Sequence, residues 1–85
     1  MTEELILPIV HVNGTSKEQL LADRYEFLDA LLKAGEKIGK IAPNGRDYYP
    51  GGPELLDQAE EQFKRRRALL RGLADEIEAE IGELL

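Results

Sequence analysis

The sequence has no cysteine and no tryptophan, and its only histidine is His11. The missing cysteine excludes disulfides, zinc thiolate sites and thiol nucleophiles, and one histidine cannot build a multi-histidine metal site. We therefore expect no bound metal and no cofactor. Because a chain of 85 residues buries too small a fraction of its surface to be very stable alone, self-association is the remaining source of stability.

Basic charge is also scarce, since 11 lysines and arginines stand against 17 aspartates and glutamates, giving a formal net charge of -6. Binding to duplex nucleic acid depends on neutralising phosphates, so an acidic protein of this kind is not expected to bind it. A small anion held in a local basic pocket remains compatible with this composition.

Long hydrophobic runs are missing as well. The apolar stretch 5–12 (LILPIVHV) follows Glu3 and Glu4, contains Pro8 and is too short to span a bilayer. We expect no signal peptide, no membrane anchor and no membrane partner. Its β-branched side chains favour an extended arm, which either lies along the helices or reaches onto a neighbouring subunit. We favour an arm that packs in an oligomer.

The first helix is predicted over residues 15–42. Asn13-Gly14 is a turn signal, and Thr15 with Glu18 forms a capping box, while Ser16 with Gln19 offers the same pattern one residue later. Apolar residues then recur at spacings of three and four, as in an amphipathic helix. They are Leu20, Leu21, Tyr25, Phe27, Leu28, Leu31, Leu32 and Ile38.

The second helix is predicted over residues 53–85, with Gly52 at its N-cap and Pro53 in its first turn. A heptad-like stripe follows, made of Leu56, Ala59, Phe63, Arg66, Leu70, Leu73, Ile77 and Leu84. With an arm and turn over 1–14 and a loop over 43–52, the chain is expected to be a single all-α domain, 1–85, folded as an antiparallel helical hairpin. Each stripe is wider than one partner covers, which predicts a helical-bundle homo-oligomer. A plain coiled-coil-like hairpin without a ligand is the alternative.

The loop is the first candidate site, because ten residues exceed the two to eight that usually connect two helices. Arg46 can bind a phosphate in bidentate fashion, and the adjacent tyrosines offer flat faces for stacking a base. The candidate ligand-binding residues here are Asn44, Gly45, Arg46, Asp47, Tyr48 and Tyr49. The alternative is structural, with the tyrosines closing the end of a bundle and Arg46 paired with an acidic neighbour.

Two further residues are candidates. Arg66 lies on the predicted apolar stripe within the basic cluster Lys64–Arg67, so it either pairs with a carboxylate of another helix, lines an anion pocket or belongs to a solvated face. His11 lies at the opposite end of a single hairpin from the loop, and only an oligomer could unite the two. No nucleophile or carboxylate is arranged against His11, so we expect no enzyme.

Gly35 and Gly39 weaken the first helix near its end, where each costs about 1 kcal/mol relative to alanine. Close approach of another helix explains such glycines, and so does room for a ligand.

The segments His11-x-Asn13-Gly14-Thr15 and Ala42-Pro43-Asn44-Gly45-Arg46-Asp47-Tyr48-Tyr49-Pro50 resemble those of a family of short uncharacterised proteins from phages, prophages and mobile elements. The resemblance implies a phage accessory protein in the bacterial cytoplasm. The expected architecture is also similar to that of phage sponges, which sequester the cyclic oligonucleotide signals of anti-phage defence.

These observations support three hypotheses. The first is a non-enzymatic homo-oligomer that binds and sequesters a nucleotide-like anionic defence signal around the interhelical loop. The second is a protein-interaction factor or inhibitor that binds a host or phage protein through its acidic helices or its arm. The third is a hydrolase of a small phosphate ester, which would need a metal site built from scattered carboxylates.

Overall fold

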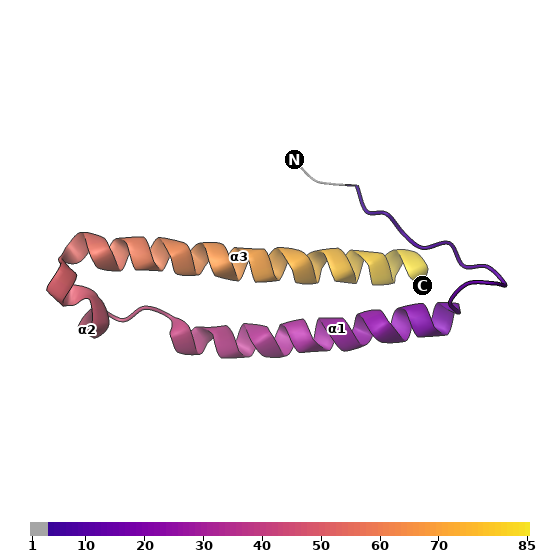
Figure 1. The fold of residues 1–85 in the computed structure, drawn as a ribbon, viewed down its shortest axis with the longest axis horizontal. Helices are drawn as coiled ribbons and strands as arrows, with labels where there is room; N and C mark the ends of the chain where they lie inside the picture. The colour runs from indigo at the N-terminus through magenta and orange to yellow at the C-terminus, as the bar shows by residue number, and fades with distance from the viewer. Residues whose placement is uncertain (1–3) are drawn as a thin grey trace.

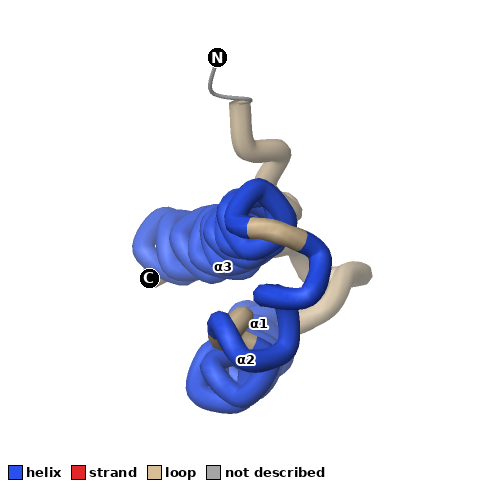
Figure 2. Tube along the Cα trace, turned by 90° about the vertical axis from the view of Figure 1, so that its left-hand side faces the viewer, coloured by secondary structure: helices blue, strands red, loops and turns tan. Residues whose placement is uncertain are grey.

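The structure is a computed structural model that describes residues 4–85, and within this range it is helical and has no strand. This confirms the all-helical prediction. The elements in chain order are α1 (Lys17–Ile38), the 3-10 turn η1 (Gly39–Ile41), α2 (Gly45–Tyr48), the 3-10 turn η2 (Tyr49–Gly51) and α3 (Pro53–Leu84). The long helices α1 and α3 lie side by side and run in opposite directions (Figures 1 and 2).

The first helix is shorter than the predicted 15–42, for a reason at each end. Ser16 rather than Thr15 is the N-cap, because its Oγ accepts the hydrogen bond from the Gln19 amide at 3.1 Å. At the other end, Pro43 disfavours helical geometry in the residue before it. Ala42 is accordingly extended, and the chain leaves α1 through the η1 turn.

The segment predicted as a loop, 43–52, contains two short helical elements instead of open loop. Asn44 caps α2, since its Oδ1 accepts from the Asp47 amide at 3.3 Å and its Nδ2 donates to the Asp47 carboxylate at 2.9 Å. Gly52 then precedes α3 with φ of +93°, a left-handed conformation that glycine adopts without a Cβ clash. Together these elements bridge the ends of α1 and α3 (Figure 1).

The core is a thin seam between α1 and α3. Its most buried side chains, Leu31, Ala74, Ile81 and Leu84, are still 6–8% exposed. An ion pair of 2.8 Å joins Arg24 of α1 to Glu80 of α3, with both side chains mostly shielded from solvent. Half-buried residues complete the seam: Leu20, Leu21, Leu28, Ile38, Leu56, Ala59, Phe63, Leu70 and Ile77.

The arm before α1 is extended from residue 4 and turns at His11–Gly14, where the Gly14 amide donates to the His11 carbonyl at 3.1 Å. It lies near the end where α1 begins and α3 ends (Figure 1). Ile6, Ile9 and Val12 are largely exposed. Residues 1–3, which belong to the predicted arm, lie outside the described part of the chain.

The resulting molecule is one layer of helices, with extents of 62 × 27 × 17 Å. Several large apolar side chains of the long helices face solvent: Tyr25, Phe27, Leu32, Leu69 and Leu73. None of the helices within residues 4–85 combines the length and the apolar content that crossing a bilayer requires.

Candidate functional site

The structure places Asn44 at the N-cap of α2, residues 45–48 on α2 and Tyr49 in the η2 turn. The polar groups of Asn44 and Asp47 bond to each other, so two of the six loop residues that were expected to contact a ligand are engaged in capping. Gly45 begins α2 beside Leu56, whose Cδ2 would lie 3.9 Å from a Cβ at that position. Arg46 and Tyr49 are exposed, whereas Tyr48 is half-buried.

His11 and Arg66 lie apart from this segment. The arm that carries His11 joins α1 at the end of the molecule away from α2 (Figure 1), and the His11 ring covers Gly14, with Nε2 2.7 Å from where a Cβ of Gly14 would be. Arg66 is exposed on the middle of α3. A single chain therefore does not bring the eight predicted site residues together.

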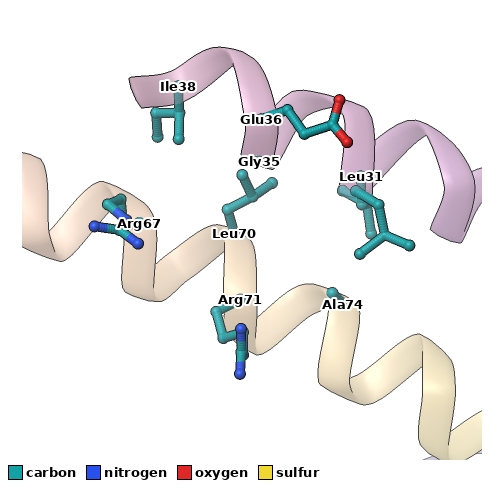
Figure 3. Close-up of a pocket in the computed structure, with 9 residues that line it drawn as sticks. Leu31, Gly35, Glu36, Ile38, Arg67, Leu70, Arg71 and Ala74 are labelled. Carbon is teal, nitrogen blue, oxygen red and sulfur yellow. The ribbon is translucent and has the colours of Figure 1, made fainter. Parts of the chain in front are cut away.

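A different feature is hollowed out between the two long helices. We call it the α1–α3 groove; it has a volume of about 460 Å³, which lies in the usual range for small-molecule sites. Figure 3 shows residues of both helices around it. The groove is lined by Leu31, Leu32, Gly35, Glu36, Ile38, Arg67, Leu70, Arg71 and Ala74.

The groove arises from small residues on both helices. Gly35 offers no side chain opposite Leu70, whose Cδ2 would lie 4.0 Å from a Cβ at position 35. Ala74 contributes only a methyl group on the facing side of α3. A larger pair at these two positions would fill the space, as leucines and isoleucines do along the rest of the seam. The cost in helix propensity of Gly35, near the end of α1, thus accompanies an open space between the helices.

Two arginines line the groove from α3. Arg67 and Arg71 are four residues apart and therefore share one face of the helix. The Arg67 guanidinium carbon lies 5.9 Å from the centre of the Phe63 ring, which orients it. Arg71 makes a long ion pair with Asp75, at 3.9 Å. Both arginines are exposed, so their donors remain accessible to a bound anion.

A smaller hollow of about 280 Å³ adjoins the groove and extends its basic character. It is lined by Lys64, Arg67, Ala68 and Arg71. Because the two hollows share Arg67 and Arg71, an apolar surface and a cluster of three cations meet at one place. Glu36 of α1 is the acidic member of the same lining, and it can accept hydrogen bonds from a ligand amine or hydroxyl.

The sequence analysis anticipated parts of this groove but placed its candidate site elsewhere. It noted the basic cluster and the possibility of space at Gly35, yet it chose Arg66 within that cluster. Neither hollow is lined by Arg66, His11 or any residue of 43–52. The spacing of Arg67 and Arg71 was a usable signal, since two arginines four apart face the same side of a helix.

The described part of the chain contains no cluster of side chains suited to binding a metal ion. Within residues 4–85, no three histidine, aspartate or glutamate side chains gather in a position to hold a metal ion. The scattered carboxylates considered for a hydrolase are therefore not brought together there.

Comparison with known proteins gives one kind of match. The chain is 30% identical over 77 residues to the protein RecA of Streptococcus pneumoniae strain Hungary19A-6, and equally to that of strain CGSP14. Each match covers 82% of this chain but only 20% of the relative, so the chain spans about a fifth of the length of the curated relatives it matches. No family model and no solved structure matches the chain.

Proposed function

We propose that the protein is a non-enzymatic binding module that takes a nucleotide-like anion in the α1–α3 groove. The observation that carries this proposal is that the α1–α3 groove is lined by Arg67 and Arg71 and adjoins a smaller hollow that adds Lys64. An otherwise acidic protein has concentrated positive charge beside an apolar cavity of small-ligand size. This arrangement favours an amphipathic anion over a uniformly charged polymer.

The lining suggests how such a ligand would lie. A flat base or a similar apolar group would cover Leu32, Ile38 and Leu70 on the floor of the groove. A phosphate would then reach Arg67 and Arg71, whose planar guanidinium groups match its oxygens. On the opposite side, Glu36 would accept a hydrogen bond from an exocyclic amine or a ribose hydroxyl.

Binding without turnover amounts to sequestration if the protein is abundant relative to its ligand. We propose this role in a bacterial cytoplasm, for a phage accessory protein that removes a nucleotide signal of host defence, as the resemblance to short phage proteins implies. The working form would be a homo-oligomer of helical hairpins, because the exposed apolar side chains of α1 and α3 leave surface to be covered. This proposal places the ligand in the α1–α3 groove, whereas the sequence analysis placed it at the interhelical loop.

Calorimetric titration with cyclic dinucleotides, cyclic oligonucleotides and mononucleotides tests the proposal. We expect saturable binding to at least one of them. Replacing both Arg67 and Arg71 by alanine should weaken that binding at least tenfold, because each hydrogen bond to a charged group contributes about 1.5–3 kcal/mol. Gly35→Leu should weaken it as well by filling the groove.

Two matched variants locate the site. Arg65→Ala removes a neighbouring arginine that does not line the groove, and Arg46→Ala removes the arginine of the α2 segment. Both should bind like the wild type. Loss of binding in Arg46→Ala alone would place the site at α2 and overturn the groove, whereas no binding to any nucleotide would overturn the proposed function.

A second candidate function is a protein-interaction factor, and the exposed apolar residues of the long helices favour it. Leu69 is 64% exposed and Leu32 is 55% exposed, which are high values for leucines within packed helices. A host or phage protein could cover such a surface. A pull-down from host lysate should then recover one stoichiometric partner, and Leu69→Ser should release it, while replacing the groove residues Arg67 and Arg71 should have no effect.

A further inference from the structure

One flank of α3 carries a short stripe that lies outside the α1–α3 groove. Arg66, Leu69, Leu73 and Glu76 follow one another at spacings of three, four and three, so they share one face of the helix. Leu69 and Leu73 are 64% and 39% exposed. We call this the 66–76 stripe. It lies across the helix from Arg67 and Arg71, as 3.6 residues per turn dictates, and is thus separate from the α1–α3 groove.

Within the described residues 4–85, the two charges of the stripe, Arg66 and Glu76, form no ion pair within 4 Å. The nearby Glu80 is already paired with Arg24. A basic and an acidic group therefore flank an exposed apolar pair, with one charge at each end of the stripe.

The stripe is complementary to a second copy of itself that runs in the opposite direction. If two copies of α3 meet in opposite directions about a two-fold axis near residue 71, Leu69 of each copy lies against Leu73 of the other. The same axis places Arg66 of each copy against Glu76 of the other. Such an isologous contact repeats every interaction twice. In the parallel arrangement, by contrast, Arg66 would meet Arg66 and Glu76 would meet Glu76.

The wider charge distribution on α3 supports the antiparallel direction. Within the part of α3 from residue 64 to residue 83, the positive side chains come first, at Lys64, Arg65, Arg66, Arg67 and Arg71, and the negative ones follow at Asp75, Glu76, Glu78, Glu80 and Glu83. An antiparallel pair about residue 71 places the basic segment 64–67 of one helix beside the acidic segment 75–78 of the other, which favours this orientation and disfavours the parallel one.

We propose that the 66–76 stripe is a self-association surface, and that its occupant is the same stripe of a second copy in antiparallel orientation. The contact buries Leu69 and Leu73 and pairs Arg66 with Glu76 across the two-fold axis. The α1–α3 grooves then face away from the contact, so ligand binding and dimerisation are separate properties of the molecule.

Sedimentation equilibrium of the wild type and of charge variants tests this surface. The wild type should dimerise reversibly. Arg66→Glu and Glu76→Arg should each raise the dimer dissociation constant by about tenfold, because two pairs change from attractive to repulsive. The double variant Arg66→Glu/Glu76→Arg restores opposite charges and should return the constant to near the wild-type value.

Controls separate this contact from a general charge effect. Lys37→Glu changes the net charge by the same amount as Arg66→Glu, but on the exposed face of α1, and should leave the dimer dissociation constant unchanged. Leu69→Ser should weaken it, and circular dichroism should show all variants equally helical. A monomeric wild type would overturn the proposal, and so would a dimer that the single reversals leave intact or the double reversal fails to restore.

Discussion

Ser16 and Asn44 each begin a helix by accepting a hydrogen bond from a backbone amide three residues later. The first amides of a helix have no partner within the helix, and these side chains satisfy one of them. The sequence pattern at residues 15–19 allowed two registers, because Thr15 with Glu18 and Ser16 with Gln19 both match a capping box. The sequence pattern alone could not distinguish the two registers, because the N-cap is the residue whose backbone is still extended just before the helix begins.

Ser16→Ala should destabilise the protein by about 1 kcal/mol, because it removes the acceptor for the Gln19 amide. Thr15→Ala is the matched control and should have little effect. Chemical denaturation monitored by helical circular dichroism measures both. If Thr15→Ala proves the more costly change, the cap lies in the other register.

Arg66 shows that the structure matches one of the three alternatives left open by the sequence, the solvated face. Its place in the heptad-like stripe suggested a position between the helices, yet the structure leaves it exposed. The inner face of α3 is instead formed by residues such as Phe63, Leu70 and Ala74, and the stripe drifts off that face at Arg66 and Leu73. Periodicity gives the apolar side of a helix to within one neighbouring position, and Arg66 falls within that margin.

At the scale of the elements, α1 and α3 are joined by a seam that combines small apolar contacts with one ion pair. Arg24 also donates from Nη1 to the Leu20 carbonyl at 3.1 Å, so its guanidinium is held on α1 while its Nε meets Glu80. Both side chains are largely shielded from solvent. Removing either one therefore leaves the other charge partly buried and unpaired, which lowers the stability of the fold.

Arg24→Ala and Glu80→Ala should each destabilise the protein by about 1–3 kcal/mol, since each leaves a partly buried charge without its partner. The double variant should cost less than the sum of the two, and the difference is the coupling energy of the pair. Strictly additive losses would show that the two groups do not interact in solution. Urea denaturation of the four proteins supplies the measurements.

The two long helices were predictable because Gly52-Pro53 and the Ser16 region mark their starts and apolar residues recur at helical spacing in between. The short helix α2 was not predicted, although Asn44 and Asp47 stand at the spacing of an N-cap and its partner. The two prolines and three glycines of this segment favour turns, so the sequence predicted a loop and the helix cap at Asn44 was not recognised.

At the scale of the whole molecule, the protein is elongated. Its radius of gyration is 18.3 Å, whereas a compact domain of this length would have about 12 Å. Elongation leaves a high proportion of apolar surface exposed, which is why self-association was expected from the sequence. The α1–α3 groove could not be foreseen in the same way, because it depends on Gly35 of one helix meeting Leu70 and Ala74 of the other.

If exposed surface is covered by a second copy, thermal stability should depend on protein concentration. The midpoint of unfolding should rise by several degrees over a roughly hundredfold increase in concentration, since the dimer unfolds to monomers. Leu69→Ser should reduce that dependence. A midpoint that stays constant over the whole range would indicate that the folded protein remains a monomer. Melting curves followed by circular dichroism are sufficient.

The thickness of 17 Å has a further consequence for the backbone. A helix with its side chains is about 10–12 Å across, so no peptide group in this layer lies more than one side chain away from water. Small openings of a single turn are enough to expose an amide. Hydrogen exchange will therefore proceed largely through local fraying that spreads from the helix ends, and the longest-lived amides will be those near Leu31 and Ala74, midway along the rod.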